Sequence, residues 1–243
     1  MTRRALLHGG ACLLGSQEGR PLFDGNSFDG WRDPGQLSPA GDSWRIEDGA
    51  LSASRDPHLL EDLVTESAYG DFDLEFSWKL DRAGNSGIKY CLVEEVFFEN
   101  TEPGWAKGRR VSGRQFAAGT RGQVYLAALE LQLIDDGAHP DALRGPDRRT
   151  GALYGAIPPE KPARLGPDWN DGRLVRRGDT IEHWINGERL LRYELTDARV
   201  AARWQRSESR RAAFARAIRE PRPLALQNHG DSRVWFRGLR LRT

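Results

Sequence analysis

The sequence is poor in cysteine, poor in lysine and free of long apolar runs. Its two cysteines, Cys12 and Cys91, are too few for a disulfide framework in a chain of 243 residues, and they match no metal-ligand spacing. No segment approaches the ~18 consecutive apolar residues that a membrane-spanning helix needs, so we expect no membrane span. The formal net charge is only +1, and without an excess of positive charge nucleic acid is not an expected partner.

The first residues of the chain, MTRRALLHGGACLLGSQ, combine two arginines with a short, interrupted apolar run. This pattern is typical of a truncated secretory signal, and a disordered tail is an equal alternative. A signal at residues 1–19 predicts a periplasmic or extracellular location, while a cytoplasmic location stays open. We predict one domain over residues 20–243, because all-β sandwiches of this size form a single domain.

The middle of the chain has the turn signals that are typical of β-structure. Asp-Gly and Asn-Gly pairs, which supply the positive φ angles of tight hairpins, recur at positions 24, 29, 48, 136, 171 and 186. Between them lie short runs with a hydrophobic period of two, at residues 44–54, 71–80, 86–93, 129–135 and 179–187. Many short strands joined by turns predict a sandwich or a barrel.

Two segments depart from this pattern. Residues from Phe98 to Gln123 are rich in Gly, Arg and polar groups without a clear period, which predicts a long loop or a lid. Residues from Thr196 to Arg219 lack Gly and Pro and are rich in Ala and Arg, which predicts one helix ending before Pro221. We expect this helix to pack outside the sandwich through its large apolar residues. These are Val200, Trp204, Phe214 and Ile218.

Alternation along the strands separates an apolar face from a polar one, because successive side chains of a strand point to opposite faces. A solvated outer face gives the same alternation, and this alternative stays open. However, all but four of the 36 basic residues are arginine, so an ordinary outer face should carry Arg, Thr and Glu. The polar rows hold Gln, His and Lys instead, which bind hydroxyls and exchange protons. We predict that six residues of these polar rows, two of them glutamates, share one pocket on a concave sheet face. They are Glu75, Lys79, Glu130, Gln132, Gln227 and His229.

A set of blocks in fixed order resembles the 3-keto-disaccharide hydrolase domain. The blocks are LFDGNSFDGW, WRIEDGAL, DFDLEFSWK, GNSGIKY, ELQLIDD, GALYG, DWND, IEHWING and LQNHGDSRVWFRGLRLR. They run from about residue 20 to the C-terminus. The positions that match the family's blocks are Glu75, Lys79, Asn85, Glu130, Gln132, Asp135, His183, Asn186, Gln227 and His229. The chain departs from the family between Phe98 and Gln123, and at Gly238, where Asn is more usual.

The resemblance implies a concanavalin A-like, two-sheet jelly-roll sandwich with one C-terminal helical insertion. It also implies a carbohydrate substrate already oxidised to a ketone at C3, cleaved by a hydrolase or by a 1,2-lyase with hydration of the resulting enone. A divalent metal ion is implied for some members, and no organic cofactor. These are expectations for the structure to test.

The chemistry of such a substrate explains the residue types. A ketone at C3 acidifies the C2 proton, so a base can form an enolate and the C1 oxygen can leave by β-elimination. His229 or Glu130 is the expected base, Lys79 or a metal the enolate stabiliser, and Glu75 or Asp135 the acid or a metal ligand. The residues expected to bind the substrate are Asn85, Lys89, Gln132, Tyr154, His183 and Gln227. His183 shares parity with Ile181 and Ile185, so the pattern alone slightly favours a buried histidine over a binding residue.

Two other functions stay open at this point. An endo-glycanase on the same fold needs paired carboxylates spaced E-x-D-x-x-E or E-x-D-x-E on one strand. Here Asp71 replaces the first Glu of one strand, and Gln132 stands at the centre of the other. A non-catalytic, lectin-like carbohydrate-binding module is the second alternative, because function does not follow from fold.

Overall fold

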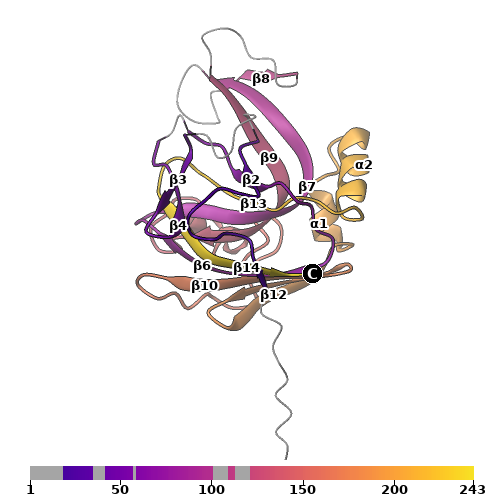
Figure 1. Cartoon of the computed structure of the whole chain (residues 1–243). Helices are drawn as coiled ribbons and strands as arrows, with labels where there is room; N and C mark the ends of the chain where they lie inside the picture. The colour runs from indigo at the N-terminus through magenta and orange to yellow at the C-terminus, as the bar shows by residue number, and fades with distance from the viewer. Residues whose placement is uncertain (1–18, 35–41, 57–58, 101–108, 113–120) are drawn as a thin grey trace, which may run out of the picture.

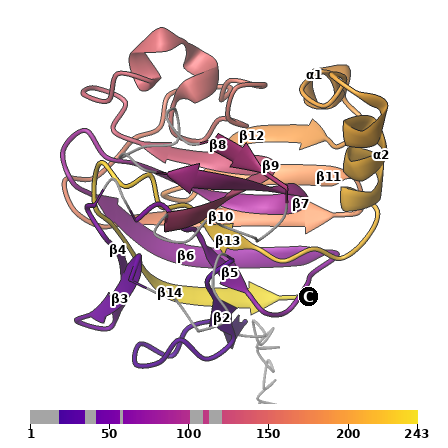
Figure 2. The same cartoon turned by 90° about the horizontal axis from the view of Figure 1, so that it is seen from above.

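The computed structural model describes residues 19–34, 42–56, 59–100, 109–112 and 121–243. The signal or tail predicted at residues 1–19 lies outside the described residues except for Gly19, and so does Cys12. In the described part, two antiparallel sheets pack face to face (Figure 1, Figure 2). The predicted two-sheet, concanavalin A-like sandwich is therefore confirmed. No helix of the described part has both the length and the apolar character needed to cross a bilayer.

The larger sheet has the strand order β12–β11–β10–β6–β14–β4–β3, with β1 paired to β14. Its strands are β1 (Arg20–Pro21), β3 (Trp44–Glu47), β4 (Ala50–Ala53), β6 (Phe72–Leu80), β10 (Asn170–Arg177), β11 (Thr180–Ile185), β12 (Glu188–Glu194) and β14 (Val234–Arg242). Tight turns join β3 to β4 and β11 to β12. Their Asp48-Gly49 and Asn186-Gly187 pairs have positive φ at both residues, as the predicted hairpins require.

The smaller sheet has the strand order β2–β5–β13–β7–β8, with β9 also paired to β7. Its strands are β2 (Trp31–Arg32), β5 (Leu63–Thr65), β7 (Asn85–Asn100), β8 (Arg109–Val111), β9 (Arg121–Ile134) and β13 (Ala225–Leu226). The core lies between the two sheets. Alternate residues of each long strand fill it, including Leu74 and Phe76 from β6 and Leu129 and Leu131 from β9.

The loop predicted between Phe98 and Gln123 is wrong at both ends. Strand β7 continues to Asn100 and β9 begins at Arg121, so the two strands pair well beyond their apolar centres (Figure 1). Strand β8 adds to the edge of β7 there. Backbone pairing with a neighbouring strand extends these segments where side-chain periodicity gives no signal. Residues 101–108 and 113–120 lie outside the described part, so the predicted lid stays a prediction.

The single helix predicted from Thr196 to Arg219 is two shorter helices, α1 (Ala198–Ala202) and α2 (Glu208–Ala217). Helix α2 begins at Glu208, and the side chain of the preceding Ser207 caps it by accepting the Arg210 backbone N–H. The helices lie at one end of the sheets (Figure 2). The predicted apolar contacts are confirmed, since the four large side chains are buried: Val200, Trp204, Phe214 and Ile218. Two 3-10 turns, η2 (Ala142–Arg144) and η3 (Pro146–Arg148), follow β9.

Candidate active site

A small pocket of about 110 Å³ lies on the outer face of the smaller sheet. Strands β7 and β9 supply its floor, because the residues that alternate with their core-facing neighbours point the other way. Loops after β9 and around β5 and β13 supply its walls. The lining residues are Asp62, Asn85, Lys89, Tyr125, Glu130, Gln132, Tyr154, Gln227, Asn228 and His229.

Strand register places the floor residues side by side. Lys89 of β7 lies opposite Glu130 of β9, and Gly87 lies opposite Gln132. A side chain at Gly87 has no room, since an added Cβ would stand 2.4 Å from Glu130 Oε1. The glycine therefore leaves the space that the Glu130 carboxylate occupies.

A buried ion pair stands at one side of the pocket. Lys89 Nζ lies 2.7 Å from Asp62 Oδ2, and the two side chains are only 2% and 3% exposed. The Lys89 ammonium also lies 4.7 Å from the centre of the Tyr125 ring. Burial lowers the pKa of Lys89, but the charge and hydrogen bond of Asp62, together with Tyr125 and Glu130 nearby, outweigh burial and the net shift is upward. Lys89 is therefore a fixed positive charge in a site that excludes most water.

Glu130 is the carboxyl group of the pocket floor. Burial raises its pKa to about 7, even though the positive charge of Lys89 acts in the opposite direction. Its Oε1 atom is buried and has no hydrogen-bond partner among the described residues. A group with a pKa near neutrality can both give and take a proton under ordinary conditions.

Two amide oxygens share this lack of partners. Gln132 Oε1 and Gln227 Oε1 are both buried without a hydrogen bond among the described residues. Gln132 is nevertheless held in place, because its Nε2 donates to Asn85 Oδ1 at 3.1 Å. Buried acceptors without partners are costly, so these oxygens need donors from a bound ligand or from water.

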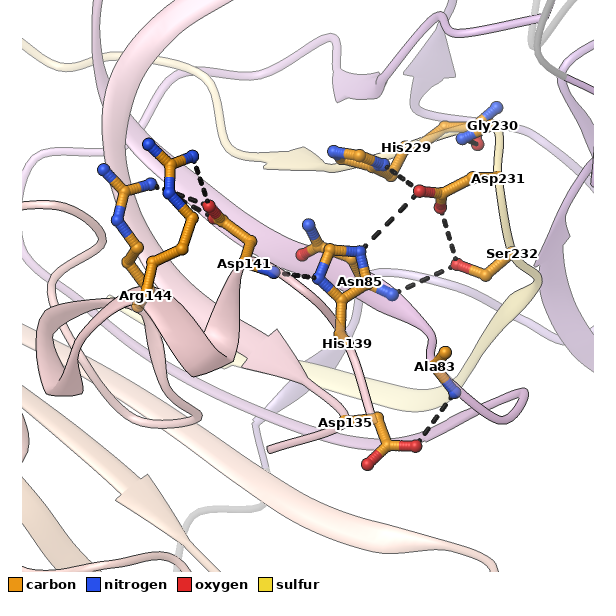
Figure 3. A network of polar contacts seen from close by, with 12 residues as sticks. Ala83, Asn85, Asp135, His139, Asp141, Arg144, His229, Gly230, Asp231 and Ser232 are labelled. Carbon is orange, nitrogen blue, oxygen red and sulfur yellow. Dashed lines mark hydrogen bonds and ion pairs between the residues drawn. The ribbon is translucent and has the colours of Figure 1, made fainter. Parts of the chain in front are cut away.

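His229 lies at the rim of the pocket next to Asp231 and His139 (Figure 3). Its Nδ1 is 2.9 Å from Asp231 Oδ2, and His139 Nε2 is 3.7 Å from the same oxygen. Burial lowers the pKa of His229, but the nearby Asp231 carboxylate, together with Glu130, outweighs burial and the net shift is upward.

These three residues are also the one group in the described part whose arrangement could hold a metal ion, with ligand atoms within 4.8 Å of one another. A histidine that binds a metal offers a lone pair and usually donates its other ring N–H. In His139, however, Nδ1 accepts the backbone N–H of Asp141 at 3.0 Å. The ring proton then belongs on Nε2, the nitrogen that faces Asp231. The group in this arrangement does not fit a metal ion.

The structure brings seven of the predicted site residues to this pocket: Asn85, Lys89, Glu130, Gln132, Tyr154, Gln227 and His229. The prediction that Glu75 and Lys79 share it is wrong. Both lie on β6 in the larger sheet, and they point away from the core on the opposite side of the sandwich. Strand parity tells which face of its own sheet a residue occupies, but not which sheet the strand joins.

On that opposite face, both residues are engaged in surface contacts. Glu75 pairs with Arg242. The Lys79 ammonium lies between the rings of Trp169 and Trp235, 4.9 and 5.1 Å from their centres. Neither residue faces the pocket on the smaller sheet, so neither can stabilise an enolate or protonate a leaving group there.

Two further predicted site residues have structural roles instead. Asp135 accepts the backbone N–H groups of Ala83, Gly137 and Ala138, which fixes the turn after β9. His183 is fully buried in the core, where it contacts Tyr90 and Gly151 through both ring nitrogens. Burial lowers the pKa of His183 to about 4, so it stays neutral. The open interpretation of His183 as a buried histidine is the correct one.

Sequence reasoning missed three pocket residues, namely Asp62, Tyr125 and Asn228. Two neighbours of His229, His139 and Asp231, were missed as well. Asp231 stands in the block LQNHGDS, so its place two residues after His229 was a signal that could have been used. Asp62 precedes a very short strand and carries no such signal.

Known proteins resemble this chain over most of its length. A model of the 3-keto-alpha-glucoside-1,2-lyase-like domain matches residues 18–242. The chain is 30% identical over 248 residues to a 3-keto-disaccharide hydrolase of Bacteroides thetaiotaomicron (strain ATCC 29148), a match that covers 91% of this chain and 77% of that protein.

Two solved structures from Parabacteroides distasonis ATCC 8503, both provisionally assigned as glycosyl hydrolases, share the fold. One is 24% identical with a TM-score of 0.63 and covers 90% of this chain and 91% of its own. The other is 20% identical with a TM-score of 0.55 and covers 88% of this chain and 98% of its own. With the family model matched over nearly its whole length, the chain belongs to the 3-keto-alpha-glucoside-1,2-lyase-like domain family.

Proposed function

We propose that this protein cleaves the glycosidic bond of 3-keto-glycosides, including 3-keto-disaccharides, by removing the C2 proton and eliminating the C1 oxygen. The observation that carries the proposal is one small pocket that combines Glu130, His229 and the buried charge of Lys89. The relative that is a 3-keto-disaccharide hydrolase supports the same substrate class. Elimination followed by addition of water gives the same products as hydrolysis.

In the first step a base takes the C2 proton, and the electron pair of the C–H bond forms an enolate with the C3 ketone. The enolate then collapses to a C1–C2 double bond, the C1–O bond breaks, and the leaving oxygen takes a proton from an acid. One proton leaves the substrate and one returns, so the enzyme ends with its acid and base exchanged. Adding water across the double bond yields the free 3-keto-sugar and resets them.

His229 is the base in this proposal, and Glu130 is the acid. The Asp231 carboxylate beside His229 Nδ1 favours proton uptake by the ring. Burial keeps Glu130 largely protonated up to about pH 7, the condition that a general acid needs. Lys89 supplies fixed positive charge near the enolate, where low water content strengthens its effect.

In this proposal the buried amide oxygens of the pocket bind the sugar. Gln132 and Gln227 each present a buried amide oxygen without a partner among the described residues. Sugar hydroxyl groups next to the ketone can donate to these oxygens and so supply the hydrogen bonds that they lack. No step of this mechanism passes through a metal ion, since the hydrogen bonds of His139 do not fit one.

The isotope content of the product tests the proposed chemistry. A 3-keto-glycoside deuterated at C2 should lose its label to solvent during turnover, because the deuteron held by the 37% exposed His229 side chain exchanges with solvent before water adds. The substrate should also react more slowly if proton removal limits the rate. Product analysis by mass spectrometry measures both. Full retention of deuterium at normal turnover would exclude elimination and leave direct hydrolysis.

A matched pair of substitutions tests the location of the site. Glu130→Gln removes the proton of the acid without changing its size, and turnover should fall at least roughly a hundredfold. Glu75→Gln makes the same change on the other sheet, where Glu75 pairs with Arg242, and turnover should stay within about twofold. Equal losses in the two variants would remove the basis for placing catalysis in the pocket.

A further inference from the structure

We infer that Asp231, supported by His139, is a positioning residue that fixes the ring of His229 with Nε2 free to act as the base. The inference rests on the proposed function, in which His229 removes the C2 proton. It adds that the His139–Asp231–His229 group, which could be taken for a metal site, holds protons instead. The contacts of His139, Asp231 and His229 support this arrangement (Figure 3).

The ring of His139 is buried. The backbone N–H of Asp141 donates to its Nδ1 at 3.0 Å, so that nitrogen must be the acceptor. A neutral imidazole has one acceptor and one donor nitrogen, so Nε2 carries the proton. This N–H faces Asp231 Oδ2 at 3.7 Å and presents positive charge density to the carboxylate.

The carboxylate of Asp231 is anchored to the smaller sheet. Its Oδ1 accepts the Ser232 hydroxyl at 3.1 Å, and that hydroxyl in turn accepts the backbone N–H of Asn85 at 3.1 Å. The carboxylate therefore cannot rotate freely. The interaction with His229 outweighs burial and lowers the pKa of Asp231, so the group is ionised.

His229 Nδ1 is buried and lies 2.9 Å from Asp231 Oδ2, at ion-pair distance but not aligned for a hydrogen bond. The charge of an ionised Asp231 at this distance favours the tautomer in which Nδ1 carries the proton. Nε2, on the other edge of the ring, then has the free lone pair. The His139 ring packs against the His229 ring edge-on, with centroids 5.8 Å apart, which restricts rotation of the base.

The chain between the two residues is shaped for this contact. Gly230 has a φ of +77°, and an added Cβ would lie 1.9 Å from Leu60 Cδ2. Its backbone N–H donates to Asn228 Oδ1 at 2.9 Å. His229 and Asp231 are two residues apart in the chain, and the tight turn at Gly230 between them brings their side chains together.

The test compares Asp231→Asn with Asp171→Asn, a matched change on the larger sheet, where Asp171 binds Ser77. Asp231→Asn should lower kcat at least roughly a hundredfold with KM changed less than about threefold, because an amide no longer enforces the tautomer. Asp171→Asn should leave both constants unchanged. A loss of kcat below about threefold in Asp231→Asn would overturn the inference.

Nitrogen-15 NMR of the wild-type protein provides a readout that needs no turnover. We expect His229 to show a protonated Nδ1 and a free Nε2, and Asp231→Asn to shift the ring toward the other tautomer. Titration with zinc chloride should leave the His139 and His229 signals in place. A wild-type His229 protonated at Nε2, or zinc bound to both rings, would overturn the inference. Because these signals do not depend on substrate, failure of the proposed function alone would leave them unchanged.

Discussion

The two outer faces of the sandwich carry the same kinds of side chain, but these are buried on the smaller sheet and partly exposed on the larger one. On the smaller sheet, Lys89 is 2% exposed and pairs with the equally buried Asp62. On the larger sheet, the side chains of Lys79 and Glu75 are 30% and 43% exposed and contact tryptophans and arginines at the surface. Residue type and strand parity are alike on both faces, so neither of them makes a site.

What differs is the chain that covers each face. Over the smaller sheet, residues after β9 fold back along it, and Tyr154 N donates to Glu130 O at 3.1 Å. The loop before β5 brings Asp62, and the loop after β13 brings His229. This cover removes water, raises the pKa of Glu130 and leaves oxygens without partners. A polar row becomes reactive when other segments bury it.

The largest expected effect concerns the two lysines. Lys89→Met leaves the buried Asp62 carboxylate without its partner and should lower the free energy of unfolding by about 3–5 kcal/mol. Lys79→Met removes a half-exposed charge and should cost about 1 kcal/mol or less. Urea denaturation of both variants measures the difference. Equal costs would show that burial does not distinguish the two faces.

The next effect is a pH dependence of stability from Glu130, whose pKa burial raises from the ordinary value of 4.5 to about 7 in the folded protein. Because the folded state holds the proton more tightly, its stabilising contribution is complete below about pH 4.5 and is lost as the pH rises through about 7. Glu130→Gln removes this loss. Between pH 4 and pH 8, the free energy of unfolding of the variant should therefore rise by roughly 3 kcal/mol relative to that of the wild type.

Urea denaturation across this pH range measures that difference directly. Glu75→Gln serves as the control on the exposed face and should follow the wild type throughout. If the stability difference between Glu130→Gln and the wild type did not change with pH, the Glu130 carboxyl would not be the buried group that the site requires.

A smaller effect is expected from the glycine beside Glu130. Gly87→Ala places a Cβ 2.4 Å from Glu130 Oε1, so the carboxyl must move. Turnover should fall about tenfold, as expected for a misplaced catalytic group, with a stability cost of about 1–3 kcal/mol. Gly70→Ala is the control, since its Cβ would meet only Pro221 at 4.0 Å. Unchanged turnover in Gly87→Ala would mean that the position of Glu130 is not critical.

The sequence allowed most of the floor of the site and part of its walls to be predicted, but not the segment that carries Asp62. Glu130 and Gln132 follow from alternation within one strand, and the leucines between them show which way they point. Asp62 reaches Lys89 across 27 residues of chain, from a loop whose path depends on the whole sandwich. Alternation also could not tell that β6, with Glu75, joins the other sheet. Alternation along a strand predicts which side chains share a face, whereas tertiary packing decides which strands and loops lie next to each other.

The secondary structure shows the same division. The strands with strong alternation and the Asp-Gly and Asn-Gly hairpins were predicted from local chemistry. The ends of β7 and β9 were not, because pairing between strands extends them. The break between α1 and α2 follows from the capping side chain of Ser207 inside a segment that otherwise favours helix.

The most direct test of the account is a crystal structure of the Glu130→Gln variant soaked with a 3-keto-disaccharide. The account predicts a sugar ring in the pocket on the smaller sheet, with hydroxyls at the amide oxygens of Gln132 and Gln227 and C2 facing His229 Nε2. A ring bound instead over Glu75 and Lys79 on the larger sheet, with this pocket empty, would contradict it.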